Sequence, residues 1–88
     1  MKPPLLIAML LITSTQASAA IYTTKPGTKF YAVPNGRMID ASPDMIETPP
    51  IKSKDAWCFF KLLDGRGATL NPPTGWTQCK NLDRFVGN

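Results

Sequence analysis

Histidine is missing from this chain of 88 residues, and cysteine occurs only twice. Without histidine the commonest general base is absent, so neither a Ser-His-Asp nor a Cys-His catalytic arrangement can be built. The 6 carboxylates show no spacing typical of a glycosidase pair, and aspartates often serve turns through local hydrogen bonds. If both cysteines are oxidised, no thiolate nucleophile or metal ligand remains. These absences predict a protein that is not an enzyme and that uses no metal or cofactor.

A long hydrophobic run is also missing, because the unbroken apolar stretch Leu5–Ile12 has only 8 residues. A membrane-spanning helix needs ~20, so a membrane anchor is the weaker alternative. Lys2 precedes this stretch, and the pair Ala17 and Ala19 follows it with the small-residue spacing of a cleavage site. We therefore expect residues 1–19 to be a secretory signal peptide, cut after Ala19 or Ala20. The product would reach the periplasm or leave the cell, with no stable membrane insertion.

Residues 20–88 then form a single domain of 69 residues. The chain carries a formal net charge of +4, and loss of Lys2 leaves about +3. The basic residues are scattered, without the run that would follow a phosphate backbone, so we expect no nucleic-acid partner. The remaining charge serves solubility or weak attraction to an anionic envelope surface or an acidic partner.

So small a domain buries only ~60% of its unfolded surface and benefits from a covalent staple. Export places it in an oxidising compartment, and Cys58 and Cys79 allow only one intramolecular disulfide. The alternatives are two free thiols or an intermolecular bridge. Closing the loop of 22 residues from Cys58 to Cys79 should contribute ~3 kcal/mol.

Strand signals dominate residues 20–88, and no helical periodicity persists for about 10 residues without meeting proline or glycine. Between the expected strands we predict a tight turn at Pro34–Gly36, a long loop at Ser42–Asp55 with one possible helical turn, and a long connection at Leu63–Thr74. The tail after Cys79 is expected to make a single turn. The predicted fold is all-β, a small closed or half-open barrel with one disulfide and long loops. Its five short strands are Ile21–Thr24, Phe30–Val33, Arg37–Ala41, Trp57–Leu63 and Gly75–Cys79.

The last two strands are expected to pair antiparallel, with Cys58 directly opposite Cys79. Side chains alternate between the two faces of a strand. This register places Cys58, Phe60, Leu62, Thr77 and Cys79 on the inner face. It places Trp57, Phe59, Trp76 and Gln78 on the outer face.

The segments "WCFFKLLDGRG" and "TGWTQCKNL" resemble the second half of bacterial SH3-like (SH3b) domains. That family often shows a Trp-led strand, a "DGR" turn, then "GW" before a further strand and a final leucine. "KPGTKFYAV" and "PNG" resemble its first half more weakly. The insertion "ATLNPPT", the length of "SPDMIETPPIKSKD" and the disulfide depart from the family pattern. The resemblance implies a small barrel that serves as a binding module of cell-envelope proteins, directed at peptidoglycan or peptides.

Aromatic side chains are the leading candidates for a binding site, since Trp and Tyr are favoured at binding surfaces. We predict a groove formed by Trp57, Trp76, Phe59 and Tyr31, with Lys29 on its rim beside the turn that follows Lys25. The alternative is that both tryptophans only cover the outside of the barrel or pack under the long loops. The expected function is a non-catalytic module that binds peptidoglycan or an extended peptide of an envelope protein.

Two other functions fit the same sequence. The first is a small periplasmic inhibitor or immunity protein, or an accessory subunit of an envelope assembly for secretion or conjugation. In that case Gly67–Gly75 would be a contact loop pre-ordered by its two prolines. The second is a structural homo-oligomer that forms by pairing of edge strands.

Overall fold

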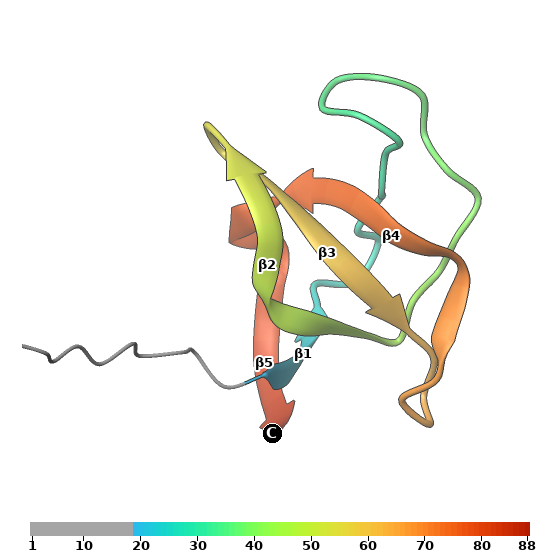
Figure 1. Cartoon of the computed structure of the whole chain (residues 1–88), viewed down its shortest axis with the longest axis vertical. Coiled ribbons are helices and arrows are strands. Elements are labelled where there is room, and N and C mark those ends of the chain that lie inside the picture. The colour runs from blue at the N-terminus through green and yellow to red at the C-terminus, as the bar shows by residue number, and fades with distance from the viewer. Residues whose placement is uncertain (1–18) are drawn as a thin grey trace, which may run out of the picture.

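A computed structural model describes residues 19–88 as one antiparallel sheet with the strand order β4-β3-β2-β1-β5 (Figure 1). All but the last residue of the predicted signal peptide lies outside the described residues. No helix among residues 19–88 is long and apolar enough to cross a membrane. The elements are β1 (Ala20–Thr24), β2 (Met45–Lys54), β3 (Trp57–Leu63), β4 (Thr69–Gln78), the 3₁₀ turn η2 (Cys79–Asn81) and β5 (Leu82–Gly87).

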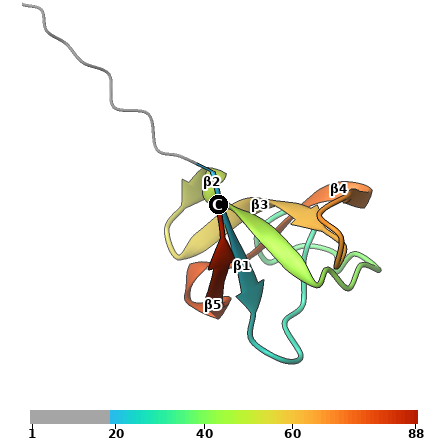
Figure 2. The ribbon, with the colours of Figure 1, turned by 90° about the horizontal axis from the view of Figure 1, so that it is seen from below.

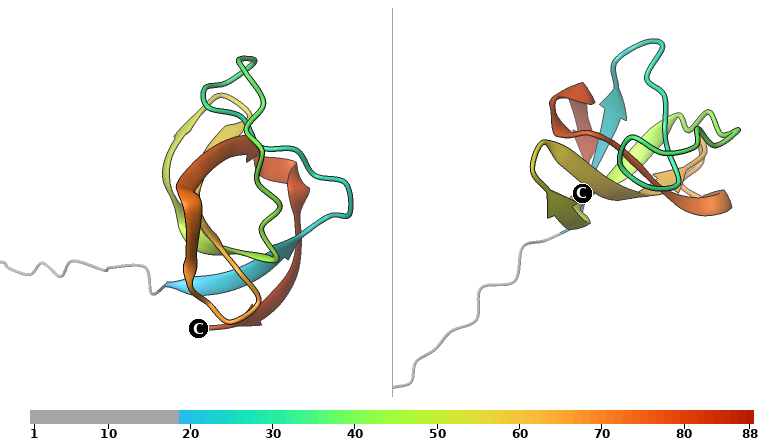
Figure 3. Two further views of the ribbon diagram at one scale, coloured as in Figure 1. Left: turned by 90° about the vertical axis from the view of Figure 1, so that its right-hand side faces the viewer. Right: turned by 90° about the horizontal axis from the view of Figure 1, so that it is seen from above.

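The fold is therefore all-β, as predicted. The sheet is open, because β4 and β5 are its two ends and do not pair with each other. It curves strongly, and Figure 3 shows the strands bending around a common interior. The interior is filled by buried side chains from β2, β3 and the segment between β1 and β2. They are Phe30, Ile46, Cys58, Phe60 and Leu62.

Strand β3 spans the predicted residues, Trp57–Leu63, and lies between β2 and β4. Its side chains alternate as a strand with one core-facing surface requires. Cys58, Phe60 and Leu62 are buried, whereas Trp57 and Phe59 are only half-buried. The apolar run predicted the strand, and the expectation that the cystine faces inward predicted which side is buried.

The prediction of a loop and a helical turn in Ser42–Asp55 was wrong, because most of this segment is strand β2. Pro49 and Pro50 lie inside that strand even though β2 is central. They fit because the pairing with β3 is interrupted between Glu47 and Lys52, and this irregularity contains both residues that cannot donate to a ladder.

The returning strand is also longer than predicted, since β4 begins at Thr69 and the connection from β3 is short. Pro72 and Pro73 lie in an irregular part of β4, where the register with β3 shifts between Lys61 and Leu63. The Asp64 carboxylate closes the connecting turn by accepting hydrogen bonds from two backbone amides, at 2.8 and 2.9 Å. The expected contact loop at Gly67–Gly75 is thus mainly strand.

The strands predicted at Phe30–Val33 and Arg37–Ala41 do not form. The chain makes only isolated bridges there, in which Tyr31 pairs with Met38 and with Trp76. The Pro34–Gly36 turn between them is present, with Asn35 at φ 58°. Phe30 is fully buried, so this segment reaches the core through one side chain without becoming a strand.

The tail after Cys79 was expected to make one turn, but it continues from η2 into strand β5. β5 runs antiparallel to β1, and the two strands lie side by side in Figure 2. Leu82 packs against the core. Phe85 and Val86 remain exposed, and Phe85 contacts only the edge of the Tyr22 ring among the aromatic side chains described.

The structure confirms the Cys58–Cys79 disulfide. The predicted register was wrong by two residues, since Cys58 lies opposite Thr77 and Phe60 opposite Gly75. Cys79 belongs instead to η2, just beyond the end of β4. Because a shift of two residues preserves the alternation, the predicted inner and outer faces remain correct.

Candidate functional site

Four aromatic residues share the outer surface of β3 and β4, and we call them the aromatic strip: Tyr31, Trp57, Phe59 and Trp76. Phe59 lies opposite Trp76 in the sheet, with ring centroids 5.0 Å apart. Tyr31 meets Trp57 edge to face, with centroids 5.5 Å apart and an interplanar angle of 90°. These are favourable geometries for aromatic pairs, so the strip is a packed and rigid surface.

The two ends of the aromatic strip differ in accessibility. Lys52 of β2 lies opposite Phe59, and its ammonium is 5.2 Å from the Phe59 ring centre and 5.8 Å from that of Trp76. Trp76 is only 8% exposed. Trp76 therefore contributes mainly to packing and to a cation–π contact. Trp57 and Tyr31, at the other end, are only half-buried and offer more surface to a ligand.

A groove of about 420 Å³ lies at the accessible end of the strip, and we call it the lysine groove. The side chains and backbone that form it come from the 25–29 loop, β3, the end of β4 and η2. Its chemically informative lining residues are Tyr31, Trp57, Gln78, Asn81 and three lysines, Lys25, Lys29 and Lys80. Tyr31, Trp57 and Lys29, all predicted as ligand-binding residues, thus line one groove.

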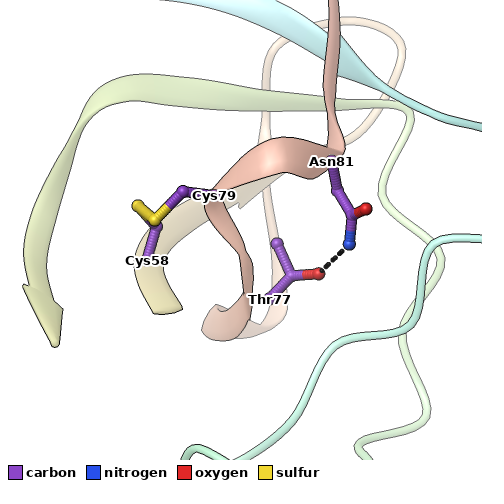
Figure 4. The surroundings of a disulfide bond; sticks show 4 residues. All are labelled: Cys58, Thr77, Cys79 and Asn81. Carbon is purple, nitrogen blue, oxygen red and sulfur yellow. Dashed lines mark hydrogen bonds between the residues drawn. A yellow bond between two sulfur atoms is a disulfide. The ribbon is translucent and has the colours of Figure 1, made fainter. Parts of the chain in front are cut away.

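The loop that carries two of these lysines is held at both ends. The Lys25 amide donates to the Asn81 carbonyl at 2.9 Å. The Thr77 hydroxyl donates to the Lys29 carbonyl at 2.9 Å. It also accepts a hydrogen bond from the Asn81 side-chain amide at 2.8 Å (Figure 4). Thr77 is only 1% exposed, and its two hydrogen bonds are partly buried.

The disulfide stabilises the turn η2, to which the 25–29 loop is hydrogen-bonded through Asn81. Cys79 opens η2 and Asn81 closes it, so the covalent bond to Cys58 ties this turn to β3. The Cys79 amide also donates to the Ala56 carbonyl at 2.8 Å. The residues at both ends of the lysine-bearing loop are therefore attached to a cross-linked part of the sheet, which lowers the entropy that ligand binding would cost.

A second pocket, of about 440 Å³, lies on the other side of the 25–29 loop. It shares Lys25 and Lys29 with the lysine groove but is also lined by Asp40 and Asp44. The two hollows therefore differ in charge. Of the two, the lysine groove is the one without a carboxylate in its lining.

Sequence reasoning placed the aromatic residues on one face but missed Lys52, Lys80 and Asn81. Lys52 was assigned to a loop, so its position opposite Phe59 could not be inferred. Lys80 and Asn81 reach the groove because the chain turns through η2 directly after the disulfide. The adjacency of Cys79 and Lys80 in sequence was the only signal available for this arrangement.

The described residues offer little reactive chemistry. Both cysteine sulfurs are in the disulfide, and no thiol is free among residues 19–88. That part of the chain also contains no group of three or more His, Cys, Asp or Glu side chains placed to hold a metal ion. What the site can offer is ring surface, ammonium groups and amide hydrogen-bonding groups.

No protein-family profile matches the chain, and neither a curated protein nor a solved structure matches it significantly.

Proposed function

We propose that the protein is a non-catalytic, exported cell-envelope binding module that presents an aromatic groove to peptidoglycan or to an extended peptide of an envelope protein. The observation that carries this proposal is the convergence of Tyr31 and Trp57 with three lysines in one groove. Rigid aromatic surface beside charged groups is typical of binding sites. The absence of histidine and the oxidised state of both cysteines support a role in binding instead of catalysis.

We also propose that the curved sheet is an SH3-like, half-open barrel. Support comes from the common interior that the strands surround and from the "DGR" turn and "GW" pair, which occupy the β3–β4 connection and β4. The predicted signal peptide supports export to the periplasm or the outside of the cell.

Sedimentation with purified cell-wall sacculi tests the binding role. The wild-type protein should co-sediment, and Trp57→Ala should weaken binding about 5-fold or more, since a truncated anchor residue typically costs at least ~1 kcal/mol. Phe85→Ala is the matched control because Phe85 is also an exposed aromatic residue but does not line the groove. Near-ultraviolet circular dichroism should show that both variants remain folded.

Two results would contradict the role. One is a wild-type protein that neither sediments with sacculi nor binds peptides released from envelope proteins. The other is a folded Trp57→Ala variant that binds as tightly as the wild type. Equal weakening by Trp57→Ala and Phe85→Ala would also argue against this groove as the site.

A further inference from the structure

The lysine groove carries a concentrated positive charge. Lys25, Lys29 and Lys80 are exposed and line it, and none of its lining residues is acidic. Among residues 19–88 the only ion pair is Lys61–Glu47, which involves none of these lysines. The three ammonium groups therefore keep their charge available for a ligand, and a groove lined by one sign of charge attracts the opposite sign.

The two pockets that share the 25–29 loop differ in the charges that line them. The pocket on its far side includes Asp40 and Asp44, which would repel an anion, whereas the lysine groove has no such group. An anionic ligand that approaches this loop is thus favoured on the side that also holds Trp57. The backbone of Lys29 is hydrogen-bonded to Thr77 and that of Lys25 to Asn81. These bonds hold the loop, so the difference in charge between its two pockets does not depend on ligand binding.

Backbone pairing argues against a peptide that binds as an added strand. Trp57 is already paired with Lys54 on one side and with Gln78 on the other. Tyr31 is bridged to Trp76 and to Met38. A peptide that extends a sheet needs an unpaired backbone edge, and neither aromatic wall of the groove supplies one. Recognition here must rely on side chains.

The side chains that remain suit a sugar. Trp57 and Tyr31 offer apolar ring surface for the C–H face of a pyranose, and the Gln78 and Asn81 amides can exchange hydrogen bonds with hydroxyls. The Asn81 side-chain nitrogen donates to Thr77, which orients its carbonyl oxygen as an acceptor. Lysine ammonium groups then pair with carboxylates carried by the same polymer.

From this combination we infer that the lysine groove binds an acidic glycan, a polysaccharide whose sugar units carry carboxylates. The inference rests on the proposed binding function and specifies its ligand class. Because the Trp57 and Tyr31 rings are perpendicular, one of them stacks on a sugar ring while the other contacts the sugar from the side. Lys25, Lys29 and Lys80 pair with carboxylates. Gln78 and Asn81 bind hydroxyl groups.

Isothermal titration of the oxidised protein with three polymers of matched length tests this inference. The probes are polygalacturonate as the acidic glycan, dextran as the neutral glycan, and poly-L-glutamate as the acidic peptide. We expect polygalacturonate to bind most tightly, with affinity that falls as salt rises. Exposed ion pairs contribute 0.2–1 kcal/mol each, so the double variant Lys29→Gln/Lys80→Gln should weaken binding roughly 2- to 30-fold.

The matched control is Arg66→Gln/Arg84→Gln, which removes the same charge from two residues outside the groove lining and should change the affinity less than 2-fold. Equal loss in both double variants would overturn the inference, because net charge alone would then explain binding. Dextran or poly-L-glutamate bound as tightly as polygalacturonate would overturn it too, as would no binding of polygalacturonate. If sacculi still bind in a Trp57-dependent manner, only the ligand class fails and the proposed function stands.

Discussion

The hydroxyl of Thr77 is the point where the sheet holds the lysine-bearing loop, so replacing it by a methyl group is a direct test of that anchor. Thr77→Val keeps the shape of the side chain and removes only its hydrogen-bonding group. The Lys29 carbonyl then loses its donor and the Asn81 side-chain amide loses its acceptor. Both losses occur beside a residue that is 1% exposed, where water has little access.

Each lost hydrogen bond should cost about 1 kcal/mol, or about 2 kcal/mol for the pair. The new methyl group offsets this by up to ~0.8 kcal/mol through burial. The net destabilisation should therefore be about 1–2 kcal/mol. For a domain of this size 1 kcal/mol lowers the melting temperature by roughly 4–8 °C.

Urea unfolding followed by tryptophan fluorescence gives the stability, and hydrogen exchange of the Lys25 amide reports on the loop. We expect Thr77→Val to accelerate that exchange, whereas Thr77→Ser, which retains the hydroxyl, should keep the amide protected. Thr74→Val is the control, because the described residues give the Thr74 hydroxyl no hydrogen-bond partner, and its stability should change by less than about 0.5 kcal/mol. The reasoning is refuted if Thr77→Val unfolds like the wild type and leaves Lys25 exchange unchanged.

Three further predictions concern stability, each measured by urea unfolding. Replacing Cys58 and Cys79 by alanine should lower the free energy of unfolding by ~3 kcal/mol, and a loss under ~1 kcal/mol would show that strand pairing alone closes the loop. Gly75→Ala should cost about 1–3 kcal/mol, because its new methyl group would be enclosed by the Ile39 side chain at 2.9 Å and by carbons of the fully buried Leu62 and Phe30, each at 3.3 Å. Gly87→Ala has open space and should be nearly neutral. Asp64→Ala should cost about 0.5–1.5 kcal/mol through loss of two turn hydrogen bonds, and equal loss in Asp64→Asn, which keeps an acceptor oxygen, would contradict this origin.

The strand that sequence predicted best is β3, because Trp57–Leu63 is an apolar run broken only by Lys61 and followed by a turn. With the cystine placed inside, the alternation of side chains along a strand put Trp57 and Phe59 on the outer face, even though the register to β4 was two residues off. The alternation of side chains between two faces is a local property of one strand. The register depends on turns, bulges and the path of the partner strand.

The prolines explain most of what sequence reasoning missed. The loop predicted at Ser42–Asp55 rests on Pro49 and Pro50, which cannot donate to a central ladder, but a strand can keep them where its register shifts. Without β2, nothing could place Lys52 over the aromatic strip. Tertiary packing also overrode local propensity at Phe30, whose β-favouring neighbours form only isolated bridges instead of a strand.

The pair Pro72–Pro73 has a further consequence, because β4 ends the sheet and most of its free edge is not paired with another strand. Neighbouring residues of a strand point their amides to opposite edges, so one of two successive prolines removes a donor from the free edge. Tyr31 already pairs with this edge at Trp76. A foreign chain that paired along this edge would meet an interrupted set of donors, which discourages the edge-to-edge strand pairing that begins amyloid fibrils.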